Sequence, residues 1–415
     1  MATKYSKHFL MTADEVKNYC VKKVRYFKNS ANLNCTEIGD GNINYVFRVV
    51  DTKTGRSLVV KQADKLLRAS GRPLNTLRSK IEAAALAVQG KLAPGTVPAV
   101  YCYDETMCAL SMEDICTYEN LRTFMLAGKT SDHFADSISS FLAETLLATT
   151  DLVLDRAQKK EWVKTFTNIE LCDISEDLVF TEPYYNYKKR NIITKGNEQF
   201  VEKHLYCNEA LKAQVGILRN SFMNNAQALI HGDLHSGSIF INETGIKVID
   251  PEFAFYGPMG YDIGNVIGNL VFALAHKSFT QPYHTEFIAW AEKAIEKTGD
   301  LTASKLSQKY DELVQFPLYN AEFKKYYLAN VQADTFGFAG TEIIRRTVGD
   351  TKVAEINSVM DKTMRLHMER ALIATGEKLI MERTRIRSAR QIVEFFNSSL
   401  KNCRAELIPT KTKRT

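Results

Sequence analysis

Apolar residues near the start of the chain recur at the spacing of an α-helix. Thr12 and Glu15 form the pattern of a capping box, and Met11 is placed before them as a hydrophobic staple. The apolar residues that share one face of this helix are Val16, Tyr19, Cys20 and Val24. The sequence therefore predicts an amphipathic helix at the N-terminus.

Short apolar runs that are typical of strands then replace the helical spacing. The runs that we interpret as strands cover residues 44–50, 57–61, 97–103 and 107–112. Among them, Ser79 to Gln89 is rich in Ala, Glu and Leu, which predicts a helix that ends at Gly90. This part of the chain is predicted to be a small sheet with one embedded helix.

Beyond a transition at residues 113–117 the pattern becomes mostly helical. Amphipathic helices are predicted within residues 131–149, 205–222, 323–331 and 351–381, and one β-rich island lies at residues 228–249. The predicted fold class is α+β with two lobes. The smaller, β-rich N-terminal lobe covers residues 1–115, and the larger, mainly helical lobe covers residues 116–405. A basic tail, residues 406–415, is expected to be flexible. Clefts between such lobes commonly bind ligands.

Composition and charge exclude several classes of protein. Hydrophobic residues make up 45% and charged residues 25% of the chain, as in an ordinary folded protein. The net charge of +6 comes from scattered Lys and Arg, and only the tail concentrates them, so we do not expect a nucleic-acid partner. Eight cysteines without a CxxC pair favour neither disulfides nor a zinc site. The most apolar stretch, Val266 to Ala275, is interrupted by Gly268 and Asn269 and is too short to span a membrane. We expect a soluble, cytoplasmic protein.

Two acidic residues joined by a predicted hairpin carry the strongest chemical signal. Asp233 lies in the loop of His231-Gly-Asp-Leu-His235, and Asp250 follows the second strand of the hairpin. Phosphoryl transfer from ATP needs such a pair, one carboxylate at the attacking hydroxyl and the other at the magnesium ion. Glu252 is predicted to lie on the same strand face as Asp250, where it could hold a second metal. The less favoured alternative is a transition-metal site made of His231, Asp233 and His235.

Upstream residues fit the same chemistry. Gly39 to Asn44 is a short glycine loop between two predicted strands, Lys61 ends the next strand, and Glu82 lies on the following helix. Kinases bind phosphates with a lysine that is anchored by a helical glutamate in this order.

Together these residues resemble the protein-kinase-like superfamily. The form His231-Gly-Asp-Leu-His235 is similar to its small-molecule branch, which includes aminoglycoside phosphotransferases, choline kinases and homoserine kinases. Three longer signatures, at residues 231–239, 250–264 and 342–349, resemble the methylthioribose kinases, ATP-dependent enzymes of methionine salvage. The resemblance covers essentially the whole chain. It departs from the wider superfamily at Ser238, where most members carry an Asn that binds metal.

The resemblance implies phosphorylation of 5-methylthioribose at its anomeric 1-hydroxyl, with ATP and Mg²⁺. Asp233 would be the catalytic base and would contact the sugar. Magnesium would be held by Asp250 and by Glu252, which would replace the missing Asn. The other residues with implied roles are Asn44, Lys61 and Pro251 at the nucleotide, the backbone of Glu113, Asp114 and Ile115 at the adenine, and Arg345 or Arg346 at the substrate.

Alternatives remain open at this point. The acceptor could be another small alcohol, such as choline, an aminoglycoside or homoserine. A catalytically silent nucleotide-binding module is disfavoured because Lys61, Asp233 and Asp250 are all present. A glycine-rich loop follows Asp250, and we interpret its Gly257 and Gly260 as turns. Asp262 in the same loop is interpreted as a brace that hydrogen-bonds to the catalytic loop around Asp233. The resemblance also implies a homodimer.

Overall fold

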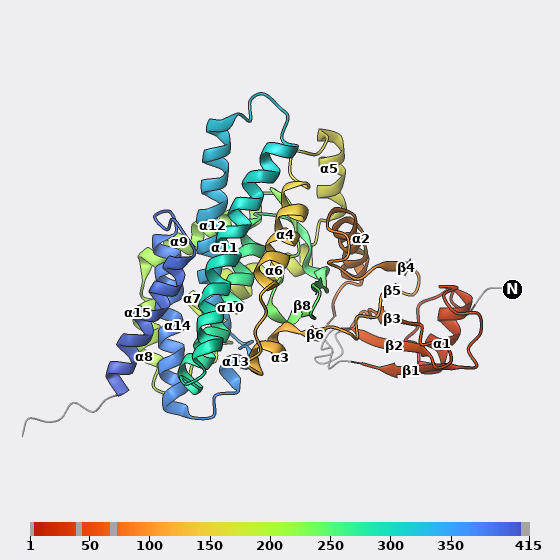
Figure 1. The fold of residues 1–415 in the computed structure, drawn as a ribbon, viewed down its shortest axis with the longest axis horizontal. Coiled ribbons are helices and arrows are strands. Elements are labelled where there is room, and N and C mark those ends of the chain that lie inside the picture. Colours follow the sequence, from red (N-terminus) through yellow and green to blue (C-terminus); the bar gives the residue numbers. More distant parts are fainter. Residues whose placement is uncertain (1–3, 39–43, 67–72, 408–415) are drawn as a thin grey trace, which may run out of the picture.

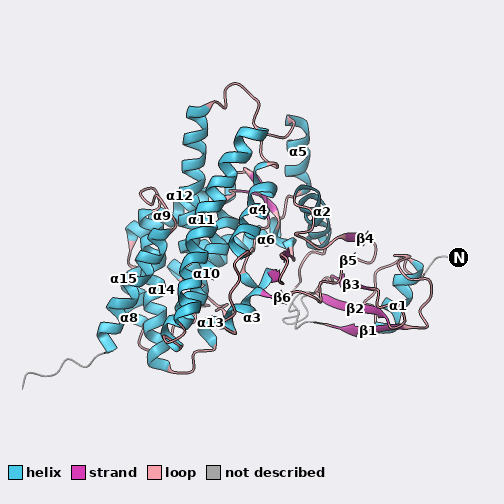
Figure 2. Ribbon diagram, in the orientation of Figure 1, coloured by secondary structure: helices cyan, strands magenta, loops and turns pink. Residues whose placement is uncertain are grey.

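The computed structural model describes residues 4–38, 44–66 and 73–407. The first five residues of the predicted glycine loop, Gly39–Ile43, and residues 408–415 of the predicted tail lie outside these ranges. The chain forms a small β-rich lobe beside a larger helical lobe (Figure 1). Most of the larger lobe is helix joined by loops, with a few short strands at its border with the smaller lobe (Figure 2). The predicted α+β, two-lobed fold class is therefore confirmed.

An antiparallel sheet with the strand order β1-β2-β3-β5-β4 builds the N-terminal lobe. The first helix of this lobe begins with the predicted capping box, because Thr12 accepts from the Glu15 amide and the Glu15 side chain accepts from the Thr12 amide. The second helix runs through Gly90 instead of ending there, because Gly90 packs against Val97 within a continuous helix. The elements are α1 (Ala13–Lys22), β1 (Leu33–Glu37), β2 (Tyr45–Asp51), β3 (Ser57–Gln62), α2 (Leu77–Leu92), β4 (Val100–Asp104) and β5 (Ala109–Met112).

The C-terminal lobe is a bundle of helices that carries two small sheets, β6-β8-β9 and β7-β10. Its strands are β6 (Glu119–Asn120), β7 (Ala228–Ile230), β8 (Ile239–Ile241), β9 (Ile246–Val248) and β10 (Phe255–Gly257). Its α-helices are α3 (Leu121–Leu126), α4 (Phe134–Leu147), α5 (Arg156–Thr165), α6 (Ile169–Phe180), α7 (Glu182–Tyr185), α8 (Glu198–Val201), α9 (Glu209–Asn224), α10 (Gly260–Thr280), α11 (Thr285–Leu313), α12 (Ala321–Val348), α13 (Ala354–Asn357), α14 (Lys362–Glu382) and α15 (Arg390–Leu407). None of the helices in the described part of the chain is both long and apolar enough to cross a membrane.

Two predicted helices are divided by polar caps. The segment 205–222 begins inside a π-helical turn, Glu202–Tyr206. It then reaches Asn208, whose side chain accepts from the Leu211 amide and starts α9. The segment 351–381 is likewise divided into α13 and α14, where Asp361 accepts from the Met364 amide. An N-cap satisfies amides that have no partner inside the helix, so it fixes a new helix start within an otherwise periodic sequence.

Glycines allow α10 and α12 to pack at very short range. A side chain at Gly264 would place its Cβ 2.6 Å from the Ala339 nitrogen. A side chain at Gly260 would place its Cβ 2.7 Å from the Thr335 nitrogen. Gly260 is therefore a packing position in a helix, and its predicted role as a turn is wrong. This contact fixes α12, whose C-terminal turns carry Arg345 and Arg346, against the helix that braces the catalytic loop.

Asp334, on α12, makes stability depend on pH. Burial raises the pKa of this carboxyl to about 6, although Arg383 and Ser221 oppose the shift. The folded state therefore binds the proton more tightly than the unfolded state, so this contribution to stability is present below pH 4 and is lost as the pH rises through about 6. We expect Asp334→Asn to be more stable than wild type by about 1–2 kcal/mol at pH 8 and equal to it at pH 4, measured by urea unfolding. The same difference at both pH values would contradict this assignment.

Candidate active site

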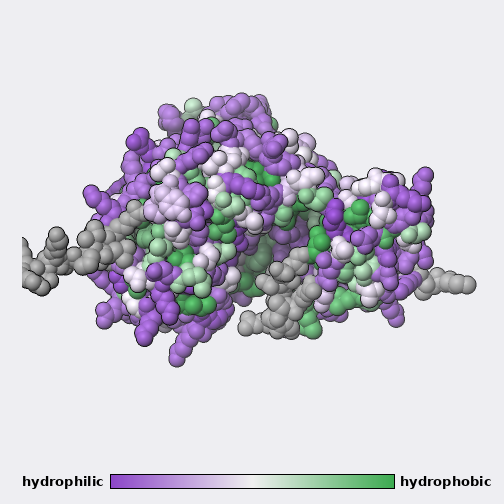
Figure 3. All heavy atoms as spheres, turned by 60° about the horizontal axis from the view of Figure 1, so that its bottom comes forward, coloured by the Kyte–Doolittle hydropathy of each residue, from purple (hydrophilic) through white to green (hydrophobic). Residues whose placement is uncertain are grey.

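The loop between β7 and β8 carries Asp233. The surface of the molecule is hollowed where the two lobes meet (Figure 3). Gly232 has a φ of 83°, and a Cβ there would lie 2.3 Å from the Phe253 carbonyl oxygen, so only glycine fits. The Asp262 carboxylate accepts from the backbone amides of His231 at 2.6 Å and Gly232 at 3.0 Å. The predicted brace is therefore confirmed. Asp262 lies in the first turn of α10, however, and not in a loop as we predicted.

Asp250 is held in a left-handed backbone conformation, with a φ of 63°. The next three residues, Pro251–Phe253, form a 3₁₀-helix. The prediction that Glu252 lies on the same strand face as Asp250 is therefore wrong, because the strand has already ended. Asn168 fixes this turn by donating to the carbonyl oxygen of Glu252 at 2.8 Å.

Lys61 forms two ion pairs, a buried one within the N-terminal lobe and a second, partly exposed one that reaches the C-terminal lobe. Its Nζ donates to Glu82 on α2 at 2.8 Å and to Asp250 at 2.6 Å. Burial alone would lower the pKa of Lys61, but Asp250 and Glu82 outweigh it and raise that pKa above the usual lysine range. The lysine is therefore a fixed positive charge beside Asp250, as a phosphate-binding group requires.

Glu252 is engaged by two residues of the N-terminal lobe. Asn44 donates to Glu252 Oε2 at 3.0 Å, and Arg78 donates to the Asn44 amide oxygen at 3.1 Å. The Arg78 Nε also lies 3.7 Å from Glu252 Oε2. Sequence reasoning missed Arg78, because a single arginine on a helix gives no signal that it is buried.

The segment Glu113–Ile115 connects the lobes and is fixed by its side chains. Lys247 on β9 donates to Glu113 at 2.8 Å, and Arg48 on β2 donates to Asp114 at 2.6 Å. The Glu113 amide donates to the Ala99 carbonyl at 2.9 Å. Within the described ranges, the Glu113 carbonyl and the Ile115 amide form no backbone hydrogen bond. One acceptor and one donor of the chain therefore remain for a ligand.

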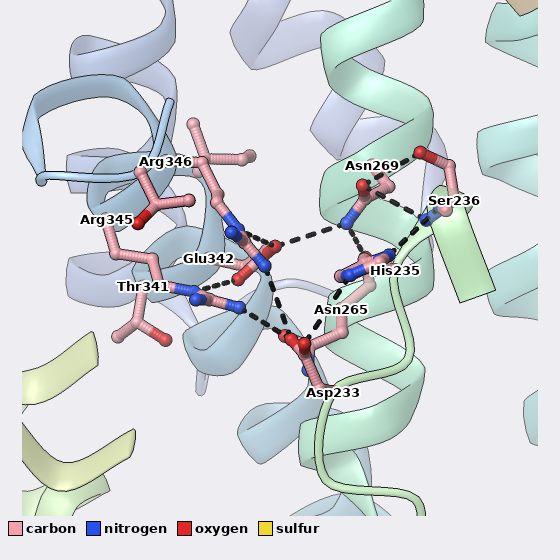
Figure 4. Close-up of polar contacts among 12 residues, drawn as sticks. Asp233, His235, Ser236, Asn265, Asn269, Thr341, Glu342, Arg345 and Arg346 are labelled. Carbon is pink, nitrogen blue, oxygen red and sulfur yellow. Dashed lines mark hydrogen bonds and ion pairs between the residues drawn. The ribbon is translucent and has the colours of Figure 1, made fainter. Parts of the chain in front are cut away.

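Two arginines from α12 meet the Asp233 carboxylate (Figure 4). Arg345 Nη2 lies 3.0 Å and Arg346 Nη2 lies 3.3 Å from Asp233 Oδ1. Both also donate to Glu342, which is completely buried. The sequence left open which arginine faces the site, and the structure brings both to it.

Charge around Asp233 controls its protonation. Burial by itself would raise the pKa of Asp233, but His235 and the two arginines outweigh burial and hold that pKa well below the usual carboxyl range. Burial lowers the pKa of His235 to about 4, although Asp233 opposes the shift. His235 is therefore neutral at pH 7, and its Nδ1 accepts from the Gly237 amide at 3.0 Å.

The transition-metal alternative finds no support in the geometry. The His231 ring bonds to the Ile249 carbonyl at 2.8 Å and accepts from the Asp233 amide at 3.3 Å, so both ring nitrogens have partners. Among the residues that the structure describes, no three His, Cys, Asp or Glu side chains gather as a metal site.

Further residues fix the catalytic loop from outside the predicted set. Asn269 on α10 accepts from the Ser236 amide at 3.2 Å and from its hydroxyl at 3.1 Å. Arg122 on α3 donates to the Ser236 hydroxyl at 3.1 Å. Ser238 donates to the Asp233 carbonyl at 3.4 Å, so this residue shapes the loop. The feature of the sequence that could have indicated these contacts is Asn269, a polar residue in the most apolar stretch of the chain.

Comparison with known proteins agrees with this geometry. Residues 167–296 match the phosphotransferase enzyme family. The chain is 35% identical to a methylthioribose kinase of Bacillus pumilus over 391 residues, which cover 90% of this chain and 93% of the relative. It is 36% identical to a methylthioribose kinase of a Geobacillus species, over 89% of this chain and 91% of that protein. It is 35% identical to one of Bacillus velezensis, over 96% of this chain and 99% of that protein. Because this identity extends over nearly the full length of both partners, the chain belongs to the methylthioribose kinase family.

Proposed function

We propose that this protein transfers the γ-phosphoryl group of ATP to the anomeric 1-hydroxyl of 5-methylthioribose, which yields 5-methylthioribose 1-phosphate for methionine salvage. The observation that carries the proposal is the position of Asp233, with Arg345 and Arg346 in contact with its carboxylate. Full-length similarity to methylthioribose kinases supports this acceptor over choline, an aminoglycoside or homoserine.

In this proposal each group has a separate duty. Asp233 orients the 1-hydroxyl and accepts its proton, and Lys61 binds the phosphates of ATP. The Glu113 carbonyl and the Ile115 amide pair with the edge of the adenine, while the Asp114 side chain keeps this connection in place through Arg48. The arginines stabilise charge on the phosphoryl group as it moves.

Magnesium fits the carboxylates of Asp250 and Glu252. Mg²⁺ in kinases is bound by one or two carboxylates together with substrate phosphates, so a cluster of three protein ligands is not required. Bound there, the ion would neutralise phosphate charge. Pro251 lies in the turn between the two residues that would hold the ion, and Asn44 donates to Glu252. Equilibrium dialysis with Mn²⁺ as a probe tests this site, and unchanged affinity in Asp250→Asn would contradict it.

The family resemblance supports two further proposals, that the protein forms a homodimer and that it is located in the cytoplasm. Sedimentation velocity tests the first, since a purely monomeric boundary at micromolar concentration would contradict it. Fractionation of the source cells tests the second.

A panel of acceptors tests the proposed reaction. We expect ADP release with 5-methylthioribose, and a kcat/KM about 10- to 100-fold lower with ribose, because the methylthio group buries apolar surface that ribose lacks. Choline and kanamycin are expected to be inactive, since Arg345 and Arg346 already neutralise the Asp233 carboxylate that a cation would otherwise bind. A coupled assay of ADP release measures all four. Turnover with choline or kanamycin instead would keep the kinase chemistry and exclude the proposed acceptor.

A further inference from the structure

The two carboxylate oxygens of Asp233 have different neighbours (Figure 4). The Oδ1 atom accepts from Arg345 at 3.0 Å and from Arg346 at 3.3 Å, so both of its lone pairs are used. The Oδ2 atom lies 3.5 Å from Nε2 of His235, and no hydrogen bond from the described part of the chain reaches it. We therefore expect the hydroxyl that Asp233 deprotonates to lie at Oδ2, on the side of His235.

The catalytic loop holds the His235 ring in one tautomer. Its Nδ1 accepts from the Gly237 amide at 3.0 Å, and the Ser238 hydroxyl lies 3.4 Å from the same nitrogen. A ring nitrogen that accepts from an N–H group carries no hydrogen itself. Burial lowers the pKa of His235 to about 4, although Asp233 opposes the shift, so the ring is neutral at pH 7. Its one N–H group is therefore at Nε2, the atom beside Asp233.

The loop also has room for this ring only because residue 237 is a glycine. A Cβ at Gly237 would lie 2.8 Å from Cε1 and 3.0 Å from Nδ1 of His235. Gly237 does not have a positive φ, so the space that the ring takes, and not the backbone conformation, explains the glycine. The loop is therefore built around the imidazole at the point where Ser238 departs from the wider superfamily.

A ligand can reach Nε2. The side chains of His235 and Asp233 are 21% and 23% exposed. Among the described residues, neither Nε2 nor Asp233 Oδ2 belongs to the polar atoms that are buried without a partner. An N–H donor and a carboxylate oxygen that are both accessible thus lie 3.5 Å apart. Because a neutral N–H can only donate, the group that it meets must be an acceptor, such as the oxygen of a hydroxyl.

We propose that His235 is a second catalytic residue, whose Nε2 donates a hydrogen bond to the oxygen of the sugar 1-hydroxyl while that hydroxyl donates to Asp233 Oδ2. The inference rests on the proposed function. An oxygen about 2.7 Å from Oδ2 and about 2.9 Å from Nε2 completes a triangle with their separation of 3.5 Å. A hydroxyl that is held at both points keeps one lone pair free to attack the γ-phosphorus.

The proton and the electron pairs then move as follows. The 1-hydroxyl proton passes to Asp233 Oδ2, and the free lone pair of its oxygen forms the bond to the γ-phosphorus. The bond from the γ-phosphorus to the oxygen that bridges to the β-phosphate breaks, and its electrons leave with ADP. His235 keeps its hydrogen throughout. Its donor stabilises the negative charge that grows on the 1-oxygen as the proton leaves.

The competing explanation is structural, in which the ring only fills the loop and binds Gly237 through Nδ1. Two substitutions separate the explanations, because each preserves one ring nitrogen. In His235→Asn the amide takes the place of Nδ1, where it can accept from Gly237, and nothing remains at the place of Nε2. In His235→Gln the longer side chain brings an N–H to the place of Nε2. A structural role makes the Asn variant the milder change, and a catalytic contact makes the Gln variant the milder one.

Single-turnover phosphorylation of 5-methylthioribose compares the two variants. We expect the rate to fall about 10- to 100-fold in His235→Asn, the loss typical of one hydrogen bond to a charged group, and less than about 5-fold in His235→Gln. The matched control is His133→Gln, at a histidine outside the site that contacts Ser137 and the Asn242 carbonyl. This control is expected to stay within about 2-fold of wild type.

A binding experiment tests the contact without turnover. Calorimetry with a non-hydrolysable ATP analogue compares 5-methylthioribose with 1,4-anhydro-5-methylthioribitol, which lacks only the 1-hydroxyl. We expect His235→Asn to reduce the wild-type preference for the 1-hydroxyl about 3- to 10-fold, the value of one hydrogen bond, and His235→Gln to keep most of it. A residue that acts only on the shape of the loop would weaken the binding of both ligands alike.

The outcomes separate the inference from the function on which it rests. If wild type phosphorylates methylthioribose and His235→Asn is the milder change, the inference is wrong and the function stands. The same holds if both variants keep the full preference for the 1-hydroxyl. If wild type does not phosphorylate methylthioribose at all, the proposed function fails and this inference fails with it.

Discussion

Replacing Asp233 by Asn is expected to lower kcat for methylthioribose by about 10²- to 10⁴-fold, the usual contribution of a general base. The amide keeps the shape of the side chain but cannot accept the proton of the attacking hydroxyl. It also removes the charge that Arg345 and Arg346 contact at 3.0 and 3.3 Å. ATP binding, measured by calorimetry, is expected to change little, because Lys61 and Asp250 are untouched.

The matched control is Asp334→Asn, the same chemical change on α12 at a residue outside the site. This variant is expected to keep kcat within about 2-fold of wild type, since it alters stability and not the reacting groups. Retention of more than about a tenth of wild-type kcat by Asp233→Asn would place the base elsewhere.

The fold and the order of the chemical groups were predictable because they depend on local patterns. The capping box at Thr12 and the alternation of strands in the first lobe report directly on backbone structure. The order of Lys61, Glu82, Asp233 and Asp250 is similarly visible in the sequence, and the structure forms the predicted pair of Lys61 and Glu82. The resemblance to the protein-kinase-like superfamily could therefore be recognised from the order of these residues alone, without any distance between them.

The remaining features depend on contacts between distant segments, which a single sequence does not record. Asp250 takes a left-handed conformation, so Glu252 leaves the strand face on which periodicity placed it. Gly260 looks like a turn residue but is small because Thr335 of another helix passes at close range. Arg78 reaches Asn44 and Glu252 from a helix whose sequence predicts only helix.

The arginine pair is a further case in which neighbours in the sequence differ in space. Helical geometry alone would point these two neighbouring side chains about 100° apart. In the structure both guanidinium groups nevertheless reach Asp233 and Glu342. Together with His235, they hold the pKa of Asp233 well below the usual carboxyl range, so the carboxylate is ionised before the reaction begins. In the proposed reaction the arginines stabilise charge on the transferred phosphoryl group, so both their charge and their planar shape matter.

Arg345→Lys is therefore expected to lower kcat by about 10²- to 10³-fold, and Arg346→Lys by about 10-fold. Lysine keeps the positive charge but cannot bridge Glu342 and Asp233 with a planar fork. Arg345 has the shorter contact with Asp233, 3.0 Å against 3.3 Å, and it also makes the shorter contact with Glu342. Single-turnover measurements of phosphoryl transfer separate this chemical step from product release.

The double variant decides whether the arginines act as one unit. Because both are anchored on the buried carboxylate of Glu342, loss of one leaves the other with a displaced partner, and the combined effect should be smaller than the product of the two single effects. Fully multiplicative effects would mean that the arginines act on different groups. Equal losses of kcat in the two single variants would contradict the larger role that we assign to Arg345. A larger loss in the Arg346 variant would reverse the two roles, and Arg345 would then only neutralise Glu342.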